Sequence, residues 1–206
     1  MSRPQSVRFS IIIPTLGRPG LMDTLQSLIP SGLEPWDEVV VVADGGAPAA
    51  HEIARLSGLE THARVKLVDL IPQGGCWGQP GRNRGMAESG GTHLVFTQDD
   101  NVLLPDALSG IRDEILDNPL ALHFFRVIPQ CGATVWGTES VHHGNIDADC
   151  GVVPNIPSRL GQWGHSYQGD VDFWTETATH WESNIFWHPV LIAAHSRYLT
   201  KEKSDE

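Results

Sequence analysis

The sequence predicts an α/β protein with a single doubly wound, mostly parallel sheet. Apolar runs of strand length alternate with segments of helical periodicity over residues 7–97, as in successive βαβ units. The expected strands are apolar on both faces, which suits buried parallel strands. Together these observations indicate a Rossmann-like sheet followed by a second half that is rich in loops.

Each element of the first half has its own signal. The first strand stops at Pro14, and the second contains four consecutive valines. Between them Leu21, Leu25 and Leu28 recur at helical spacing, which predicts a crossover helix. In chain order we expect strands at residues 7–13, 37–43, 65–70 and 93–97, with further helices at 48–56 and 80–89.

The second half has a looser pattern. A helix is expected at 105–116 and a strand at 121–128, and short strands are expected near 133–136 and 150–153. Residues 130–169 are rich in Gly, Pro, Trp and His, a composition typical of ligand-binding loops. The charged tail at 201–206 is expected to be frayed.

Composition limits the function. The 206 residues, 40% of them hydrophobic, suit one domain with its own core. A net charge of −11 gives no support to nucleic-acid binding. The apolar run at 9–13 is too short for a signal peptide or a membrane span, so we expect a cytoplasmic protein. Three cysteines without a Cys-x-x-Cys pair predict free thiols.

Polar and glycine-rich segments follow all four expected strands, where open α/β sheets bind ligands. The sequence lacks Gly-x-Gly-x-x-Gly after the first strand, and it also lacks a phosphate-binding loop with Gly-Lys-Ser/Thr. A bound phosphate would therefore have to be held by other groups. Asp99 and Asp100 end the fourth strand, and adjacent carboxylates can share Mg²⁺ or Mn²⁺ with a diphosphate. Alternatively, the pair only solvates a turn or caps the next helix.

Four segments carry a resemblance to a known family. They are Ser10-Ile-Ile-Ile-Pro-Thr15, Asp44-Gly45-Gly46 after the second strand, Gly81-Arg-Asn-Arg-Gly85 and Phe96-Thr-Gln-Asp-Asp-Asn101. In order and spacing they resemble the nucleotide-diphospho-sugar transferases of the GT-A fold, specifically the inverting family-two group, over residues 9–108. The resemblance implies a nucleotide-sugar-binding half at 1–101 and an acceptor-binding half at 102–200 within one domain.

The resemblance also implies contacts to the donor. The implied nucleotide-sugar residues are Pro14, Thr15, Arg18, Asp44, Gly74, Arg82, Gln98 and Asp99. Arg82 would supply positive charge to the diphosphate or sugar. The alternative is that the helix lies on the surface and its arginines are only solvated. The acidic motif of the family is commonly Asp-x-Asp, and here Gln98 stands at its first position. Because glutamine brings no charge, Asp100 would carry most of the attraction for the metal.

A histidine could complete the metal site, because imidazole suits Mn²⁺ and some members of the fold have a C-terminal histidine ligand. His180, His188 and His195 are candidates. We predict His188, which ends the apolar stretch 185–187, although a packing role is the alternative.

The catalytic base should come from the segment 167–174, which resembles the family's acidic segment below the acceptor. Asp170 is the predicted base and Asp172 the alternate, and Asp170 could also cap the helix that follows. Trp163 and Trp77 lie in glycine-rich surroundings and are candidates for sugar contact.

These residues predict a glycosyltransferase that uses Mn²⁺ or Mg²⁺ and a nucleotide-diphosphate donor, with inversion and an unidentified acceptor. Two alternatives stay open. One is a catalytically silent scaffold that binds a nucleotide or glycan, which Gln98 favours. The other is a sugar-1-phosphate nucleotidyltransferase, for which residues 14–18 form a poor glycine-rich loop. The sequence does not determine the oligomeric state.

Overall fold

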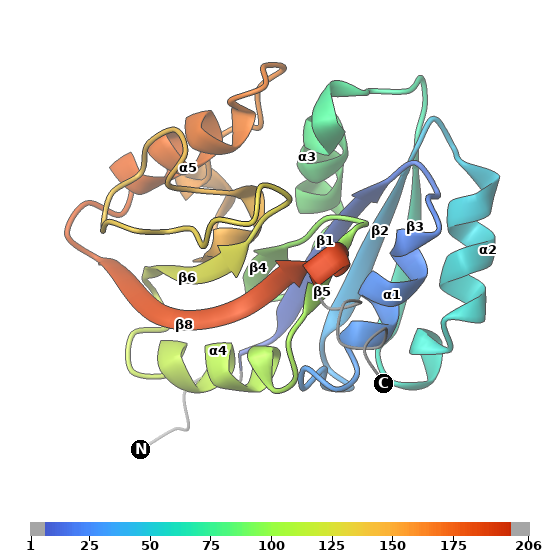
Figure 1. Cartoon of the computed structure of the whole chain (residues 1–206), viewed down its shortest axis with the longest axis horizontal. Helices are drawn as coiled ribbons and strands as arrows, with labels where there is room; N and C mark the ends of the chain where they lie inside the picture. Colours follow the sequence, from blue (N-terminus) through green and yellow to red (C-terminus); the bar gives the residue numbers. More distant parts are fainter. Residues whose placement is uncertain (1–6, 199–206) are drawn as a thin grey trace.

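The computed structural model describes residues 7–198 and contains one mixed sheet of eight strands in the order β3-β2-β1-β4-β7-β6-β8-β5 (Figure 1). Strands β3, β2, β1 and β4 are parallel, β7 is antiparallel to both of its neighbours, β6 and β8 are parallel to each other, and β5 is antiparallel to β8. This confirms the predicted α/β fold class with one mostly parallel sheet. The strands are β1 (Phe9–Thr15), β2 (Glu38–Asp44), β3 (Arg64–Leu70), β4 (His93–Phe96), β5 (Asn101–Leu103), β6 (Leu122–Ile128), β7 (Gly151–Pro154) and β8 (Ile185–His195).

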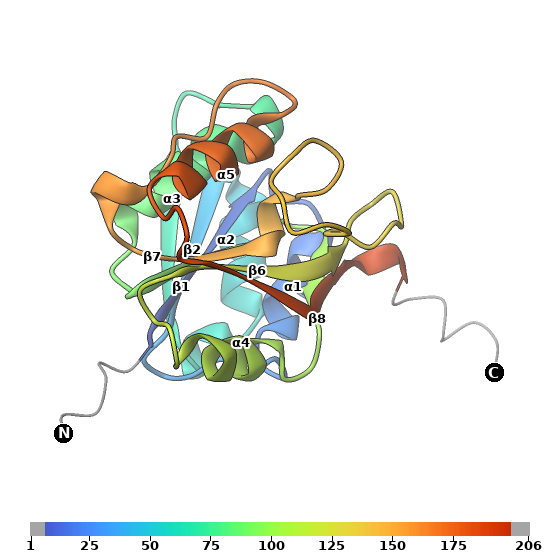
Figure 2. The same ribbon diagram turned by 90° about the vertical axis from the view of Figure 1, so that its left-hand side faces the viewer.

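Helices cover both faces of the sheet (Figures 1 and 2). Helices α1, α2 and α4 lie on one face, where the backbone N–H of Leu108 donates to the carbonyl of Ser31 and joins α4 to the segment after α1. Helices α3 and α5 lie on the other, where Asn83 exchanges hydrogen bonds with the backbone of Trp163. The helices are α1 (Gly20–Ser27), α2 (Pro48–Leu56), α3 (Gln79–Glu88), α4 (Ala107–Ile115) and α5 (Gly169–Thr179).

Helix α3 packs unusually close to β1 because its sequence supplies glycines on the contact side. A Cβ on Gly85 would lie 2.4 Å from Cγ2 of Ile12, and one on Gly81 would lie 2.8 Å from Cβ of Pro14. Every residue of β1 and β2 is buried, and most of these residues are apolar, so α3 covers a closely packed part of the sheet. This close packing places Arg82 at the carboxyl ends of the strands.

Strand β8 and the short strand β5 were not expected from the sequence. β8 contains Pro189, and proline normally argues against a strand. The register with β6 jumps from His188 opposite Phe125 to Leu191 opposite Arg126, so Pro189 lies in a bulge where its missing N–H costs no ladder bond. The strand expected at 133–136 is wrong, since only Val135 forms an isolated bridge, with Val127.

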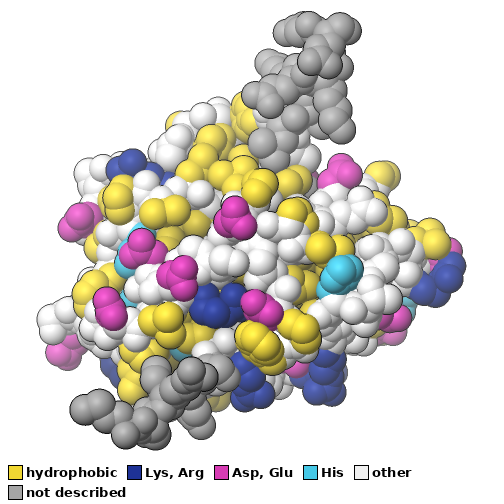
Figure 3. Space-filling view, turned by 90° about the horizontal axis from the view of Figure 1, so that it is seen from below, with side chains coloured by type: hydrophobic (Ala, Val, Ile, Leu, Met, Phe, Trp, Pro, Cys, Tyr) yellow, Lys and Arg dark blue, Asp and Glu magenta, His cyan; other side chains and the backbone are white. Residues whose placement is uncertain are grey.

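The face seen from below, around α4 and the N-terminal ends of the strands, has a mixed surface (Figure 3). Its Lys and Arg side chains lie apart and are interspersed with carboxylates rather than gathered in one patch. No helix between residues 7 and 198 has the length and apolar character needed to cross a bilayer. The tail expected to fray at 201–206 lies outside the described residues.

Candidate active site

Two cavities lie at the carboxyl ends of the strands. The smaller has a volume of about 240 Å³ and the larger about 360 Å³. Trp77, Arg82, Gln98 and Asp100 line both of them. These four residues therefore mark the place where the two cavities meet.

The smaller cavity gathers most of the residues expected to bind the nucleotide. Its lining includes Pro14, Thr15, Arg18, Asp44 and Asp99. Since these side chains follow three different strands, their meeting is a product of the parallel sheet, whose carboxyl ends share one edge.

Gly74 is placed differently from the prediction. It does not line either cavity, whereas its neighbour Gly75 lines the smaller one. Instead the N–H groups of Gly74 and Gly75 donate to the two carboxylate oxygens of Asp44, at 2.6 and 2.9 Å. A Cβ on Gly74 would lie 2.7 Å from Cβ of Pro80, so the close approach requires glycine here. Asp44 thus anchors the loop that leads into α3.

That loop carries Trp77 over the junction. Cys76 and Trp77 have φ values of 47° and 53°, in the left-handed region that non-glycine residues seldom adopt. Each residue in this conformation raises the free energy of the folded chain by on the order of 1–3 kcal/mol. The contacts at the two ends of the loop must therefore maintain the conformation. The Trp77 side chain is 65% exposed. Trp163, the other predicted sugar contact, is 2% exposed and stacks on Phe173 at 4.1 Å, but it also lines the larger cavity.

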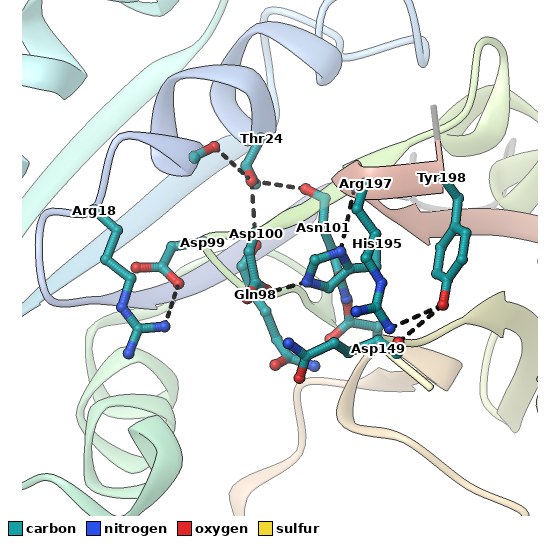
Figure 4. Close-up of polar contacts among 12 residues, drawn as sticks. Arg18, Thr24, Gln98, Asp99, Asp100, Asn101, Asp149, His195, Arg197 and Tyr198 are labelled. Carbon is teal, nitrogen blue, oxygen red and sulfur yellow. Dashed lines mark hydrogen bonds and ion pairs between the residues drawn. The ribbon is translucent and has the colours of Figure 1, made fainter. Parts of the chain in front are cut away.

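Asp99 faces Arg18, which lies in the turn after β1 (Figure 4). Its carboxylate accepts a hydrogen bond of 2.7 Å from the hydroxyl of Thr15, and Nη1 of Arg18 lies 3.9 Å away. Burial raises the pKa of Asp99, and the contacts with Thr15 and Arg18 partly offset this effect. Asp99 therefore links the two donor-side segments and leaves Asp100 as the carboxylate that faces both cavities.

His195 lies beside Asp100, and His188 does not. Nε2 of His195 is 3.5 Å from Oδ2 of Asp100 (Figure 4). The prediction that His188 joins Asp100 is wrong, because β8 points it elsewhere: its ring nitrogens contact Glu114 at 3.0 Å and His123 at 2.9 Å. The apolar residues before His188 pack against the core and orient this part of β8. The pairing of β8 with β5 instead places His195 opposite Asn101, next to Asp100.

Within residues 7–198 there is no group of three or more His, Cys, Asp or Glu side chains arranged to hold a metal ion. Asp100 and His195 nevertheless offer a carboxylate and an imidazole at the wall of the larger cavity. A carboxylate and an imidazole are both ligands that Mn²⁺ accepts, so this pair could supply two ligands to a divalent ion.

Arg82 is buried among carboxylates, which contradicts the alternative of a solvated helix surface. Burial lowers its pKa, and nearby Asp149, Asp147 and Asp170 raise it. Its Nη1 donates to the carbonyl of Trp77 at 2.9 Å, whereas its Nε has no hydrogen-bond partner among the described residues. The guanidinium therefore presents a fixed positive charge at the junction of the cavities.

Two of these carboxylates, Asp147 and Asp149, were not predicted. Gln98 donates from Nε2 to Asp147 at 3.0 Å, so the amide that replaces the first acid of the motif is bound to another acid. Asp149 is buried and accepts hydrogen bonds from Asn101 at 2.6 Å and Thr97 at 3.2 Å. Burial first, and then Asp147, raises the pKa of Asp149 to about 7. The Asp147-Ala-Asp149 spacing within a loop was the available sequence signal.

Asp170 lines the larger cavity, in the first turn of α5. It is half-buried, and burial raises its pKa, while Arg82 and His143 act in the opposite direction. The N-cap position belongs to Gln168, so the alternative of a simple Asp170 cap is wrong. Asp172 is exposed, lines neither cavity and accepts a hydrogen bond from Ser166 at 3.1 Å.

The sheet order and the position of the cavities define a fold of the GT-A type. The structure is similar to S. aureus TarS 1-349 in complex with UDP, with a TM-score of 0.72 at 14% identity over 91% of this chain. It is equally similar to the complex of that protein with UDP-GlcNAc, again with a TM-score of 0.72 at 14% identity. The chain spans 60% and 58% of those two structures. No family model and no curated protein matches the sequence.

Proposed function

We propose that this chain is a metal-dependent glycosyltransferase that moves a sugar from a uridine-diphosphate donor onto an acceptor hydroxyl with inversion. The observation that carries the proposal is the junction of the two cavities at Trp77, Arg82, Gln98 and Asp100. A donor that extends from the smaller cavity into the larger one would bring its sugar to this junction. TarS, which shares the fold, has been crystallised with UDP and UDP-GlcNAc, which supports uridine as the base.

The donor side follows from the charges at the junction. The nucleoside would lie in the smaller cavity, against Thr15 and Asp44. Its diphosphate would lie near Arg82, a fixed guanidinium that matches phosphate oxygens well. Arg18 has an exposed side chain and could reach the phosphates from the outer side.

Asp100 and His195 would hold Mn²⁺ or Mg²⁺ next to the diphosphate of the donor. When bound, the ion neutralises charge on the departing diphosphate. Gln98 and Asp147 would then position the metal ligand, because their hydrogen bond holds the segment that carries Asp100.

Asp170 would act as the general base. As the acceptor oxygen bonds to the anomeric carbon, the bond from that carbon to the diphosphate oxygen breaks, and the hydroxyl proton moves to the Asp170 carboxylate. Attack from the face opposite the diphosphate inverts the anomeric centre. Burial raises the pKa of Asp170, which makes its carboxylate a better proton acceptor than that of an exposed aspartate.

A silent nucleotide-binding scaffold is the second candidate. It is favoured by Gln98, whose amide is engaged with Asp147 and adds no charge to the metal site. Release of free sugar from UDP-sugar in the absence of an acceptor would distinguish a slow transferase from this scaffold. A requirement for nucleoside triphosphate would instead indicate a nucleotidyltransferase.

Calorimetry of UDP and GDP binding, with and without Mn²⁺, tests the proposal. Wild type should bind UDP in a Mn²⁺-dependent manner, and Asp100→Ala should lose this dependence. Asp117→Ala, at an exposed carboxylate just after α4, is the matched control and should behave as wild type. If neither nucleotide binds under any of these conditions, the proposal is wrong.

A further inference from the structure

We infer that the larger cavity accepts an uncharged sugar ring as the acceptor and disfavours acceptors that carry phosphate or carboxylate groups. The inference rests on the proposed function and adds the chemical class of the acceptor. Its basis lies in three properties of the cavity: its charge, its hydrogen-bonding character and the aromatic side chains at its mouth.

The charge of the lining is negative. Asp100, Asp147 and Asp170 line the cavity, and Arg82 is the only Lys or Arg among the described residues that do so. Even if Asp100 is neutralised by a metal ion, Asp147 and Asp170 outnumber Arg82. Burial raises the pKa of Asp147 and the charge of Asp170 raises it further, so an anionic ligand placed here would also be repelled by Asp170.

Arg82 is poorly placed to compensate for that repulsion. Its side chain is 4% exposed, donates to the carbonyl of Trp77 and is surrounded by Asp147, Asp149 and Asp170. Its position at the junction also directs it toward the diphosphate of the donor. An anionic acceptor would therefore lack a cation of its own.

The lining combines hydrogen-bond acceptors with donors that have no partner among the described residues, namely Nε of Arg82 and Nε1 of Trp163, and so calls for a ligand that both donates and accepts. Oε1 of Gln79 is buried and has no partner among the residues of the described chain, although Nε2 of the same side chain donates to the carbonyl of Ser166 at 2.7 Å. Together with the carboxylates of Asp147 and Asp170, it gives the cavity three acceptor groups. Sugar hydroxyls donate hydrogen bonds, whereas an ionised phosphate only accepts them.

Two exposed aromatic side chains from different loops meet at this cavity. Trp77 is 65% and Tyr167 is 70% exposed, and their ring centroids lie 5.5 Å apart at an interplanar angle of 78°. Both line the larger cavity, so a ligand there would cover apolar area that the fold leaves in water. Such rings provide flat apolar surfaces for the C–H faces of a sugar ring.

The test is saturation-transfer difference NMR on the full chain with UDP and Mg²⁺, which replaces paramagnetic Mn²⁺. The probes are methyl glycosides of glucose, galactose, mannose and N-acetylglucosamine, each compared with its 6-phosphate. At least one neutral glycoside should bind about tenfold more tightly than its phosphate, a factor expected for one or two partly screened like charges. Asp147→Asn combined with Asp170→Asn should reduce this preference about tenfold.

Trp77→Ala should weaken binding of the neutral glycoside about tenfold. Trp36→Ala is the matched control, because Trp36 is also exposed, at 52%, but precedes the amino end of β2 and lines neither cavity. Equal or tighter binding of the phosphates, or no binding of any neutral glycoside, would overturn the inference. UDP binding, measured separately by calorimetry, tests the proposed function itself: if UDP binds and the glycosides fail, only the acceptor class is wrong.

Discussion

His195 and Asp100 face each other across the antiparallel pair of β8 and β5, with Nε2 of the imidazole 3.5 Å from Oδ2 of the carboxylate (Figure 4). The backbone fixes this approach, because Asn101 is registered opposite His195 and the N–H of Ser196 donates to the carbonyl of Asp100 at 2.9 Å. The two potential ligands are therefore in place before any ion or donor arrives, which reduces the entropic cost of binding.

The first prediction concerns this pair. His195→Ala should weaken Mn²⁺-dependent UDP binding about tenfold or more, because the ion loses one protein ligand. UDP binding without metal should change little. Calorimetric titration of UDP at fixed Mn²⁺ measures both quantities.

His188→Ala serves as the matched control, since it removes an imidazole from the same strand. It should lower the melting temperature, because His188 stacks on Phe125 at 4.6 Å and bonds His123, but it should leave Mn²⁺-dependent binding intact. If His188→Ala weakens metal-dependent binding as much as His195→Ala, the proposed ligand set is incorrect.

The second prediction separates the base from the binding residues. Asp170→Asn should reduce the turnover number of sugar transfer by roughly 10²–10⁴, the usual contribution of a general base. UDP affinity should stay within about a factor of two to three, since the proposed donor contacts lie elsewhere. Asp172→Asn, two residues along the same helix and exposed, should retain activity. Loss of turnover in Asp172→Asn alone would assign the base to Asp172.

Gln98→Asp, which restores the common acidic motif, gives the third prediction. The substitution would replace the hydrogen bond to Asp147 by two carboxylates in contact, so at neutral pH one of them must hold a proton. We expect a lower melting temperature than wild type at pH 8 and a smaller difference at pH 5, where sharing a proton is easier. Scanning calorimetry at both pH values measures the change, and an equal loss at both would rule out charge repulsion.

The sequence predicted the sheet well in its first half because buried parallel strands and crossover helices have strong local patterns. It also selected Asp100 and Asp170, both of which line the larger cavity. It failed where the signal is non-local: β8 is held by pairing with β6 around a bulge at Pro189, and no periodicity reveals that His195 is brought to Asp100. Asp149 has a local signal in its spacing from Asp147, but only the folded chain shows that it is buried against Asn101 and Thr97.

The final prediction uses two buried groups that titrate in opposite directions. Burial raises the pKa of Asp149 from 3.8 to about 7, so the folded chain binds more protons than the unfolded one in that range and stability falls as pH rises. Burial lowers the pKa of His123 from 6.5 to about 4, so its contribution to stability is complete above pH 6.5 and is lost as pH falls toward 4. Between pH 4 and 6.5 the two slopes oppose each other.

Asp149→Asn, which keeps the shape of the side chain, should therefore make the unfolding free energy rise more steeply with pH than in wild type over pH 4–6.5. The change in slope should approach 1.4 kcal/mol per pH unit, the value for one proton. His123→Gln should change the slope in the opposite sense, because it removes the group that favours high pH. Urea unfolding at half-unit pH intervals measures all three proteins. Parallel curves for wild type and Asp149→Asn would mean that Asp149 is ionised in the folded protein throughout this range, and that Arg82 outweighs the cost of its burial.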